Sequence, residues 1–365
     1  MSSPLQGNPL ALNAVSTGHR DRVDDIAVAV IGCGLHSTTS ILPSVRHAAM
    51  RLVAVCDLDE GRAELARRQF GAERAYRSLD EVLARTDLDA VVVVGPPELH
   101  VSAGIAALES GRHVFIEKPP GTSVTDALQL QRASQLARKH VMVGFMKRRA
   151  SAYRLVKQVI AQKEFGAVTS VQLTYAHWPV AGLRLHLVDM SIHALDLVRW
   201  LVGDPSRFTV YKREVGGNHV LALMLEHSPP AVSYLDLSAF QPGVQERLVV
   251  TGEGAVVRVE GLTELEYVRQ GATDSVYEPN SRITSSWSPE LAIPDRQNDR
   301  LILQGYAGEM VAFAEAVQDG RKVDPSIDDG VAAMRLIEAI VDAPDGLSMV
   351  DLRHTRAPTV RTETA

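Results

Sequence analysis

Two short groups of residues carry side chains suited to proton transfer and to chemistry at a carbon-bound oxygen. The first is the pair Glu117-Lys118, which ends a short apolar run and precedes two prolines that force the backbone to turn. The second is Asp189 with His193, four residues apart and therefore on one face of a helix predicted over 187–201. A lysine polarises the oxygen of an alcohol or ketone, and an imidazole beside a carboxylate moves a proton near neutral pH. By spacing alone, the second group is either such an acid/base pair or a structural histidine held by its neighbour.

A glycine turn near the beginning of the chain predicts a dinucleotide site. An apolar strand expected over 26–31 runs into Gly32 and Gly34, and a helix interrupted by a proline is expected over 38–49. Strand, glycine turn and helix in this order present free backbone amides to a pyrophosphate. Ser37 stands where the usual motif has its third glycine, so the turn alone is a weak signal.

Asp57 strengthens that prediction, because it ends the next expected strand, over 51–56, a little over 20 residues beyond the turn. A carboxylate at that position receives the ribose hydroxyls of NAD and repels the 2′-phosphate of NADP, so NAD is favoured over NADP. The alternative is a carboxylate that only caps a helix. Asp59 is also placed to cap the helix expected over 60–70.

The elements that position these residues differ between the two parts of the chain. Further strands expected over 90–94, 113–116 and 141–143 alternate with helices, which predicts a parallel sheet covered by helices. The later part shows six strand-like runs separated by short polar or glycine turns, which is typical of an antiparallel sheet. The predicted fold class is α/β. It combines an N-terminal Rossmann dinucleotide-binding domain over 24–146 with a C-terminal α+β domain over 147–352 that holds a large, mostly antiparallel sheet and binds substrate.

Five further stretches complete this organisation. Helices are expected over 306–319 and 327–341. Residues 271–305 show no periodicity, which predicts a long loop. Residues 1–23 and 353–365 read as loose tails.

Composition excludes several classes of protein. The chain of 365 residues has 38 Lys and Arg against 44 Asp and Glu, a net charge of −6 that disfavours nucleic acid or an anionic membrane as partner. Its two cysteines support neither a disulfide framework nor a thiolate metal site. The polar first 23 residues contain no run suited to a signal peptide or membrane span, so a cytoplasmic protein is expected.

Several motifs in order make the chain resemble the Gfo/Idh/MocA oxidoreductase family over roughly residues 24–352. They are Gly32-Cys33-Gly34, Asp57, Pro96 to His100, Glu117-Lys118-Pro119, Gly144-Phe145 with Arg148, and Asp189 four residues before His193, followed by Asp196. Each motif alone is unspecific, whereas their ordered spacing is highly specific. The resemblance favours the acid/base interpretation of the helix pair.

The resemblance implies reversible hydride transfer between a nicotinamide and a secondary alcohol or ketone of a sugar or cyclitol. Lys118 would lie beside the nicotinamide and bind the reacting oxygen, His193 would exchange the proton, and Asp189 would bind a substrate hydroxyl or orient His193. The bond between Lys118 and Pro119 is often cis in this family. The residues expected to bind the cofactor are Gly32, Gly34, Leu35, His36, Asp57, Pro96, His100, Glu117 and Lys118.

The chain departs from the family where substrate is expected. Residues 182–186, Gly-Leu-Arg-Leu-His, replace a glycine-rich run before the catalytic helix. Arg184 and His186 there would contact a carboxylate or phosphate, which makes an anionic or nucleotide-linked sugar a possible substrate; a solvated loop is the alternative. Arg148 would add to the same positive field, or form a surface ion pair. His177 and Trp178 would stack on a sugar ring, or belong to the core.

Two further expectations follow from the resemblance. The open face of the second sheet usually forms an interface in this family, so a homodimer or homotetramer is expected. A dinucleotide-binding regulator of the same fold without turnover is the alternative to an enzyme. No metal is expected, because Asp189 and His193 lack a third ligand.

Overall fold

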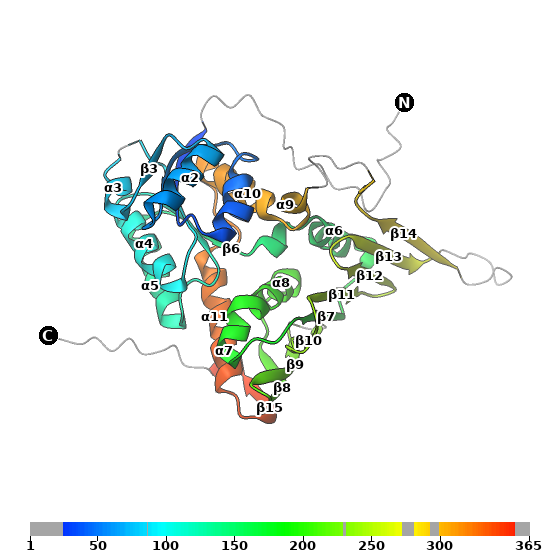
Figure 1. Ribbon diagram of the computed structural model, residues 1–365. Helices are drawn as coiled ribbons and strands as arrows, with labels where there is room; N and C mark the ends of the chain where they lie inside the picture. Colours follow the sequence, from blue (N-terminus) through cyan, green and yellow to red (C-terminus); the bar gives the residue numbers. More distant parts are fainter. Residues whose placement is uncertain (1–24, 86, 229–230, 272–280, 293–298, 355–365) are drawn as a thin grey trace, which may run out of the picture. The chain divides into compact units, whose positions relative to one another are not determined.

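The computed structural model describes residues 25–85, 87–228, 231–271, 281–292 and 299–354 (Figure 1). They form two compact units, one made of residues 25–146 with 305–338 and the other of residues 147–304 with 339–354, less the gaps. The tail predicted over 1–23 lies outside the described residues, as does all but the beginning of the tail predicted over 353–365.

The first unit is built on a six-stranded sheet whose strands all run parallel, as predicted. The strand order is β3-β2-β1-β4-β5-β6. The strands are β1 (Ile26–Ile31), β2 (Met50–Cys56), β3 (Arg74–Tyr76), β4 (Ala90–Val93), β5 (His113–Glu117) and β6 (Val141–Gly144). Every residue of β1 and β4 is buried, as expected of parallel strands covered on both faces. The three-residue β3 was not predicted, because it is too short to show a periodicity.

Helices connect these strands. They are the π-helical turn η1 (Ser37–Ile41), α1 (Leu42–Val45), α2 (Glu60–Phe70), α3 (Leu79–Leu83), α4 (Pro97–Glu109) and α5 (Val124–Ala137). The caps explain their bounds: the Asp59 carboxylate accepts the Arg62 amide at the beginning of α2, and Gly71 ends it in a left-handed conformation. The helix predicted over 38–49 stops at Val45, soon after the proline that interrupts it.

Two helices from late in the chain also belong to this unit, which corrects the predicted domain limit. The segment 305–338 was assigned to the second domain, but it contains α10 (Tyr306–Asp319) and most of α11 (Ile327–Asp342). Phe313 of α10 packs edge-on against Phe115 of β5, with ring centroids 5.9 Å apart. A hydrophobic contact between residues so distant in sequence leaves no trace in local periodicity.

The second unit is a nine-stranded sheet with the order β14-β13-β12-β11-β7-β10-β9-β8-β15. The strands are β7 (Ser170–Ala176), β8 (Arg207–Val215), β9 (Asn218–Glu226), β10 (Val232–Asp236), β11 (Gln245–Thr251), β12 (Ala255–Glu260), β13 (Glu264–Gln270), β14 (Arg282–Trp287) and β15 (Gly346–Asp351). Among the described strands of this sheet, only β7 and β10 pair in parallel, so the mostly antiparallel sheet is confirmed. The loop predicted over 271–305 is partly wrong, because β14 and the short helix α9 (Arg300–Leu303) lie in it.

Helices of this unit cover one face of the sheet. They are the 3-10 turns η2 (Met146–Arg149) and η3 (Lys163–Phe165), α6 (Ser151–Ile160), α7 (Leu183–His186), the π-helical turn η4 (Leu187–Ser191) and α8 (Ile192–Val202). The helix α6 packs on β12 and β13, and α8 packs on β7. The helical stretch of α7, η4 and α8 begins at Leu183, so the predicted loop over 182–186 is mostly its first turn.

Candidate functional site

The glycine turn after β1 has the geometry that a dinucleotide needs. Gly32 has φ +94°, and a Cβ added there would lie 1.8 Å from the carbonyl oxygen of Val94, so only glycine fits. A Cβ on Gly34 would meet no atom within 4 Å, which leaves this side of the turn open to a ligand. The side chain of Leu35 is 80% exposed beside it.

Asp57, at the end of the neighbouring β2, is held against this turn. Its Oδ2 accepts the backbone N–H of Cys33 at 2.9 Å, and its Oδ1 accepts the N–H of Asp59 at 2.9 Å. The side chain that caps the helix is that of Asp59 and not that of Asp57. The carboxylate of Asp57 faces the glycine turn instead. Arg62 of α2 also reaches Oδ1 at 3.1 Å. A carboxylate offers about four acceptor positions, so one remains for a ribose hydroxyl.

The turn after β4 is tied to the turn after β5 by His100. Its Nε2 accepts the Gly95 N–H at 3.2 Å, and its Nδ1 lies 2.8 Å from the carbonyl oxygen of Pro119. This pattern assigns the proton to Nδ1, which donates to Pro119. Burial lowers the pKa of His100 below its usual value, against the opposing effect of that hydrogen bond. Pro96, the residue before α4, lies between Gly95 and this histidine.

Glu117 and Lys118 stand at the end of β5, next to β4 in the sheet. Glu117 is buried, and its Oε2 accepts the backbone N–H of Lys118 at 3.2 Å, while Lys118 itself is half-buried. The bond between Lys118 and Pro119 is cis. His36 of the glycine turn approaches the other carboxylate oxygen of Glu117 at 3.2 Å from its Nε2.

These residues all follow the carboxyl ends of four adjacent strands. The order β2-β1-β4-β5 places Asp57, the glycine turn, Pro96 with His100, and Lys118 in a row along one sheet edge. Open α/β sheets bind ligands at this edge. The residues that the chain offers along this edge therefore fit a dinucleotide.

The second unit carries the predicted acid/base pair on the stretch from η4 to α8. Asp189 lies in η4 and is exposed, whereas His193 lies in the first turn of α8 and is buried. Segments of π-helix are rare and recur at functional sites. Of the two residues predicted from spacing, Asp189 therefore lies in an element of unusual geometry, and His193 lies in the α-helix that directly follows it.

Arg148 lies in a buried ion pair. Its Nε and a terminal nitrogen donate to the two oxygens of Asp196 at 2.8 and 2.6 Å, and both side chains are buried. Asp196 lies one turn beyond His193 in α8, so this ion pair fixes that helix to η2. The neighbouring Lys147 likewise pairs with Glu246 of β11 at 2.6 Å. The positive run at 147–149 is thus engaged by acidic residues in at least two of its three positions.

Of the other residues predicted to bind substrate, two are exposed and two are buried. Arg184 and Trp178 are exposed, Trp178 at 46%. His177 and His186 are fully buried, with ring centroids 4.7 Å apart. Burial and the nearby His177 lower the pKa of His186 to about 4, so this side chain is neutral near pH 7.

The sheet edge that carries Asp57, the glycine turn and Lys118 is called the cofactor edge below. Two residues near it were not identified from sequence. Tyr306, at the beginning of α10, packs edge-on against the His36 ring with centroids 5.5 Å apart. Nothing in the sequence relates it to the glycine turn, which lies far away along the chain. Arg62 had a visible signal, because it falls in the first turn of the helix that follows Asp57.

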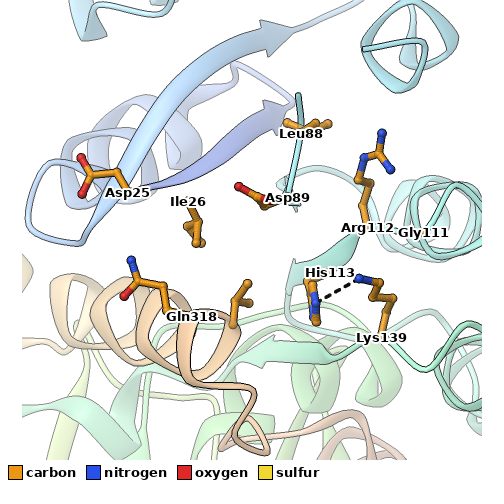
Figure 2. A pocket seen from close by; sticks show the side chains of 10 residues that line it. Asp25, Ile26, Leu88, Asp89, Gly111, Arg112, His113, Lys139 and Gln318 are labelled. Atoms are coloured by element: carbon orange, nitrogen blue, oxygen red, sulfur yellow. Dashed lines mark hydrogen bonds between the residues drawn. The ribbon is translucent and has the colours of Figure 1, made fainter. Parts of the chain in front are cut away.

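A cavity of about 750 Å³ lies at the opposite edge of the parallel sheet (Figure 2). It is lined by residues at the amino ends of β1, β4 and β5, among them Ile26, Asp89 and His113, and the Lys139 ammonium lies 3.4 Å from His113 Nε2. It contains none of the predicted site residues. In the described part of the chain, no cluster of His, Cys, Asp or Glu is arranged to hold a metal ion, and no helix is long and apolar enough to cross a membrane.

Comparisons with known proteins agree with this architecture. Residues 26–145 match the model of an oxidoreductase family with an NAD-binding Rossmann fold, and residues 153–258 match the GFO/IDH/MocA C-terminal domain. An inositol 2-dehydrogenase of Ralstonia nicotianae is 28% identical over 87% of this chain and 94% of its own length. A D-xylose 1-dehydrogenase (NADP(+)) of Haloferax volcanii is 26% identical over 88% and 98%. An Agrobacterium radiobacter oxidoreductase solved with NAD⁺, L-tartaric acid and magnesium is 22% identical, with a TM-score of 0.77 over 90% and 98% of the two chains.

Proposed function

Because the chain belongs to the Gfo/Idh/MocA oxidoreductase family, we propose that it transfers a hydride between NAD and a secondary alcohol or ketone of a sugar or cyclitol. The observation that carries this proposal is the row of Asp57, the glycine turn and Lys118 along one sheet edge. The relatives that resemble the chain over most of its length act on inositol and xylose according to their names.

The proposed roles follow from the chemistry of each side chain. The bound nicotinamide supplies or receives the hydride. The Lys118 ammonium polarises the substrate oxygen and stabilises negative charge on it, and the buried carboxylate of Glu117 fixes the backbone of that lysine. His193 takes the hydroxyl proton during oxidation and returns it during reduction, while Asp189 binds a substrate hydroxyl or orients the imidazole. Arg184 and Trp178 are exposed and available to a polar or anionic sugar.

Replacing Lys118 tests the assignment. In Lys118→Ala we expect turnover to fall at least about a hundredfold, because a preorganised charge at the developing oxyanion is lost. NADH binding, followed by nicotinamide fluorescence, should be retained. Lys139→Ala is the matched control, since that lysine lies at the other edge of the same sheet and should leave turnover near the wild-type value. His193→Asn should lower turnover about 10²- to 10⁴-fold.

Turnover is measured in a substrate screen that follows nicotinamide absorbance. The screen contains polyols and keto-sugars, some carrying a carboxylate or a nucleotide, each tested with NAD and with NADP. Unchanged turnover in Lys118→Ala contradicts the role given to this residue. Tight NADH binding without absorbance change for any substrate would instead favour a regulator without turnover.

We also propose that a second copy of the chain covers the outer face of the nine-stranded sheet. Leu347 and Met349 of β15 are 75% and 68% exposed, and Tyr211 of β8 is directly opposite Leu347 in the register. Tyr234 of β10 is exposed on the same face. Large apolar side chains that gather on one face mark an interaction surface.

A further inference from the structure

We propose that the cavity at the opposite edge of the parallel sheet binds a small organic anion, a carboxylate or a phosphate ester, between Lys139 and His113. This edge, called the amino edge below, is formed by the amino ends of β1, β4 and β5, across the sheet from the cofactor edge. It is a second ligand site of the same unit, and the inference does not depend on the proposed function.

The two ring nitrogens of His113 have different roles. The backbone N–H of His140 donates to Nδ1 at 3.2 Å, so this nitrogen carries no proton. Burial, with the nearby Lys139 and His140 adding to it, lowers the pKa of His113 to about 4, so the ring is neutral near pH 7. A neutral imidazole has one N–H, which is assigned here to Nε2. That nitrogen is therefore a hydrogen-bond donor.

The Lys139 ammonium faces this donor and not an acceptor. Its Nζ lies 3.4 Å from His113 Nε2, and an ammonium can only donate. Figure 2 shows the two groups pointing toward one another at one side of the cavity. In the described part of the chain, no carboxylate forms an ion pair with this lysine. Two donors aimed at the same space call for an acceptor with several lone pairs, and a carboxylate or phosphate group supplies it.

The rest of the cavity decides what kind of anion fits. Its volume of about 750 Å³ is that of a pocket for a small metabolite. Asp25 and Asp89 also line it, and Asp89 Oδ2 accepts the Ala27 N–H at 2.8 Å. These carboxylates repel a ligand that is anionic at both ends, but they accept hydroxyl groups. The ligand class is therefore an organic acid or phosphate ester with one anionic head and a hydroxylated remainder.

Arg112, another cation of the lining, is already used within the chain. Its two terminal nitrogens donate to the carbonyl oxygens of Ser110 and Arg85, each at 2.8 Å. It adds positive charge to the cavity while its donors stay engaged. The direct contacts of the anionic head are thus assigned to Lys139 and His113, and the test addresses these two residues.

The test follows the histidine rings of the isotope-labelled, full-length protein by NMR at pH 7.5. The His113 signals are those missing from the spectrum of His113→Phe. In the free protein, we expect nitrogen shifts that place the proton of His113 on Nε2. Glycerol phosphate, glycerate or both should change these shifts, and the anion that does so identifies the head group. His36, beside the glycine turn, reports separately any anion that binds at the cofactor edge.

Two lysine variants test the assigned contact. Lys139→Met should weaken anion binding at least about tenfold, because a charge-assisted hydrogen bond is lost while an apolar side chain of similar length remains. Lys163→Ala is the matched control. It removes the same charge from an exposed residue of η3 in the other unit, so the affinity should not change.

Several results would overturn the inference. A proton on Nδ1 of His113 in the free protein would do so, because Nε2 would then accept from Lys139 and no anion would be needed. The inference also fails if neither anion changes the His113 signals at millimolar concentration, if only His36 responds, or if Lys139→Met and Lys163→Ala bind equally well. NADH binding, measured in the same samples, tests the proposed function separately.

Discussion

His100 shows how one buried side chain sets the geometry of a neighbouring site. With both ring nitrogens engaged by backbone groups, it joins the turn at Gly95 to the turn at Pro119, which directly follows Lys118. It is 1% exposed, so it acts on the cofactor edge by holding backbone in place. The family resemblance indicated that His100 belongs to this edge, but only the fold shows the two groups that it joins.

The free energy of unfolding should therefore depend on pH through His100. Burial lowers the pKa of His100 in the folded protein, whereas the unfolded chain titrates near 6.5. Below about pH 6.5 the unfolded state binds a proton that the folded state resists, so stability falls on acidification. His100→Leu should cost about 1–3 kcal/mol at pH 7.5, because two backbone groups lose their partner. The variant should also lose less of its free energy of unfolding than the wild type between pH 7 and pH 5, as measured by urea unfolding. An equal loss in variant and wild type would contradict this account.

For single residues, the sequence shows which side chains are suited to chemistry, but it does not show whether the fold exposes or buries them. Lys118, His193 and Asp57 stand out because their chemistry and spacing are local properties. Arg148 and His186 were expected near substrate as cations, yet Arg148 is buried against Asp196 and His186 is buried and neutral. Whether a charge meets water or a partner depends on packing between segments far apart in the chain.

Among the elements, α8 is held by a buried ion pair with a residue outside it. The ion pair between Arg148 and Asp196 joins it to η2, and Asp196 lies three residues after His193. A buried carboxylate is stable only while its partner remains. The position of the predicted proton-transfer residue is thus coupled to an arginine on a different element.

A double-mutant cycle measures this coupling. Asp196→Leu should lower the free energy of unfolding by about 3–5 kcal/mol, because Arg148 then keeps its buried charge without its main carboxylate. Arg148→Met combined with Asp196→Leu should cost much less than the sum of the single changes. Urea unfolding at pH 7.5 gives the four values. Additive losses would show that the two side chains stabilise the helix independently.

Elements were predictable where local signals agree. The bounds of β1, α2 and α10 match the sequence prediction, since an apolar run or caps mark them. Between 271 and 305 such signals are missing: most side chains of β14 are exposed, so no buried face imposes an alternation. The π-helical turn η4 also escaped prediction, because a hydrophobic pattern does not distinguish it from an α-helix.

Over the whole molecule, the sequence predicts a parallel sheet followed by a mostly antiparallel one, but it does not predict which late segments return to the first unit. The change from alternating strands and helices to consecutive strands marks the beginning of the second unit near Lys147. The return of α10 to the parallel sheet is decided by contacts such as Phe313 with Phe115, which the sequence does not reveal.

The exposed apolar side chains on the outer face of the nine-stranded sheet predict that the protein is an oligomer. We expect the protein to elute as a dimer or tetramer in size-exclusion chromatography with light scattering. Leu347→Asp with Met349→Asp should shift it to a monomer, because charged side chains would have to be buried in the interface. Leu136→Asp is the control, since that exposed leucine lies on α5 of the other unit. A wild-type monomer at micromolar concentration would contradict the proposed interface.

The contact between the glycine turn and β2 has a consequence for chemical reactivity. Cys33 and Cys56 are free and buried, and the Cys33 thiol faces the carbonyl oxygen of Cys56 at 3.7 Å. Burial, with Asp57 adding to it, raises the pKa of Cys33 to about 12 and that of Cys56 to about 11. Only a thiolate reacts readily with alkylating reagents and oxidants. The chain therefore carries its two sulfur atoms beside the cofactor edge in an inert form, and their modification would report that the turn has opened.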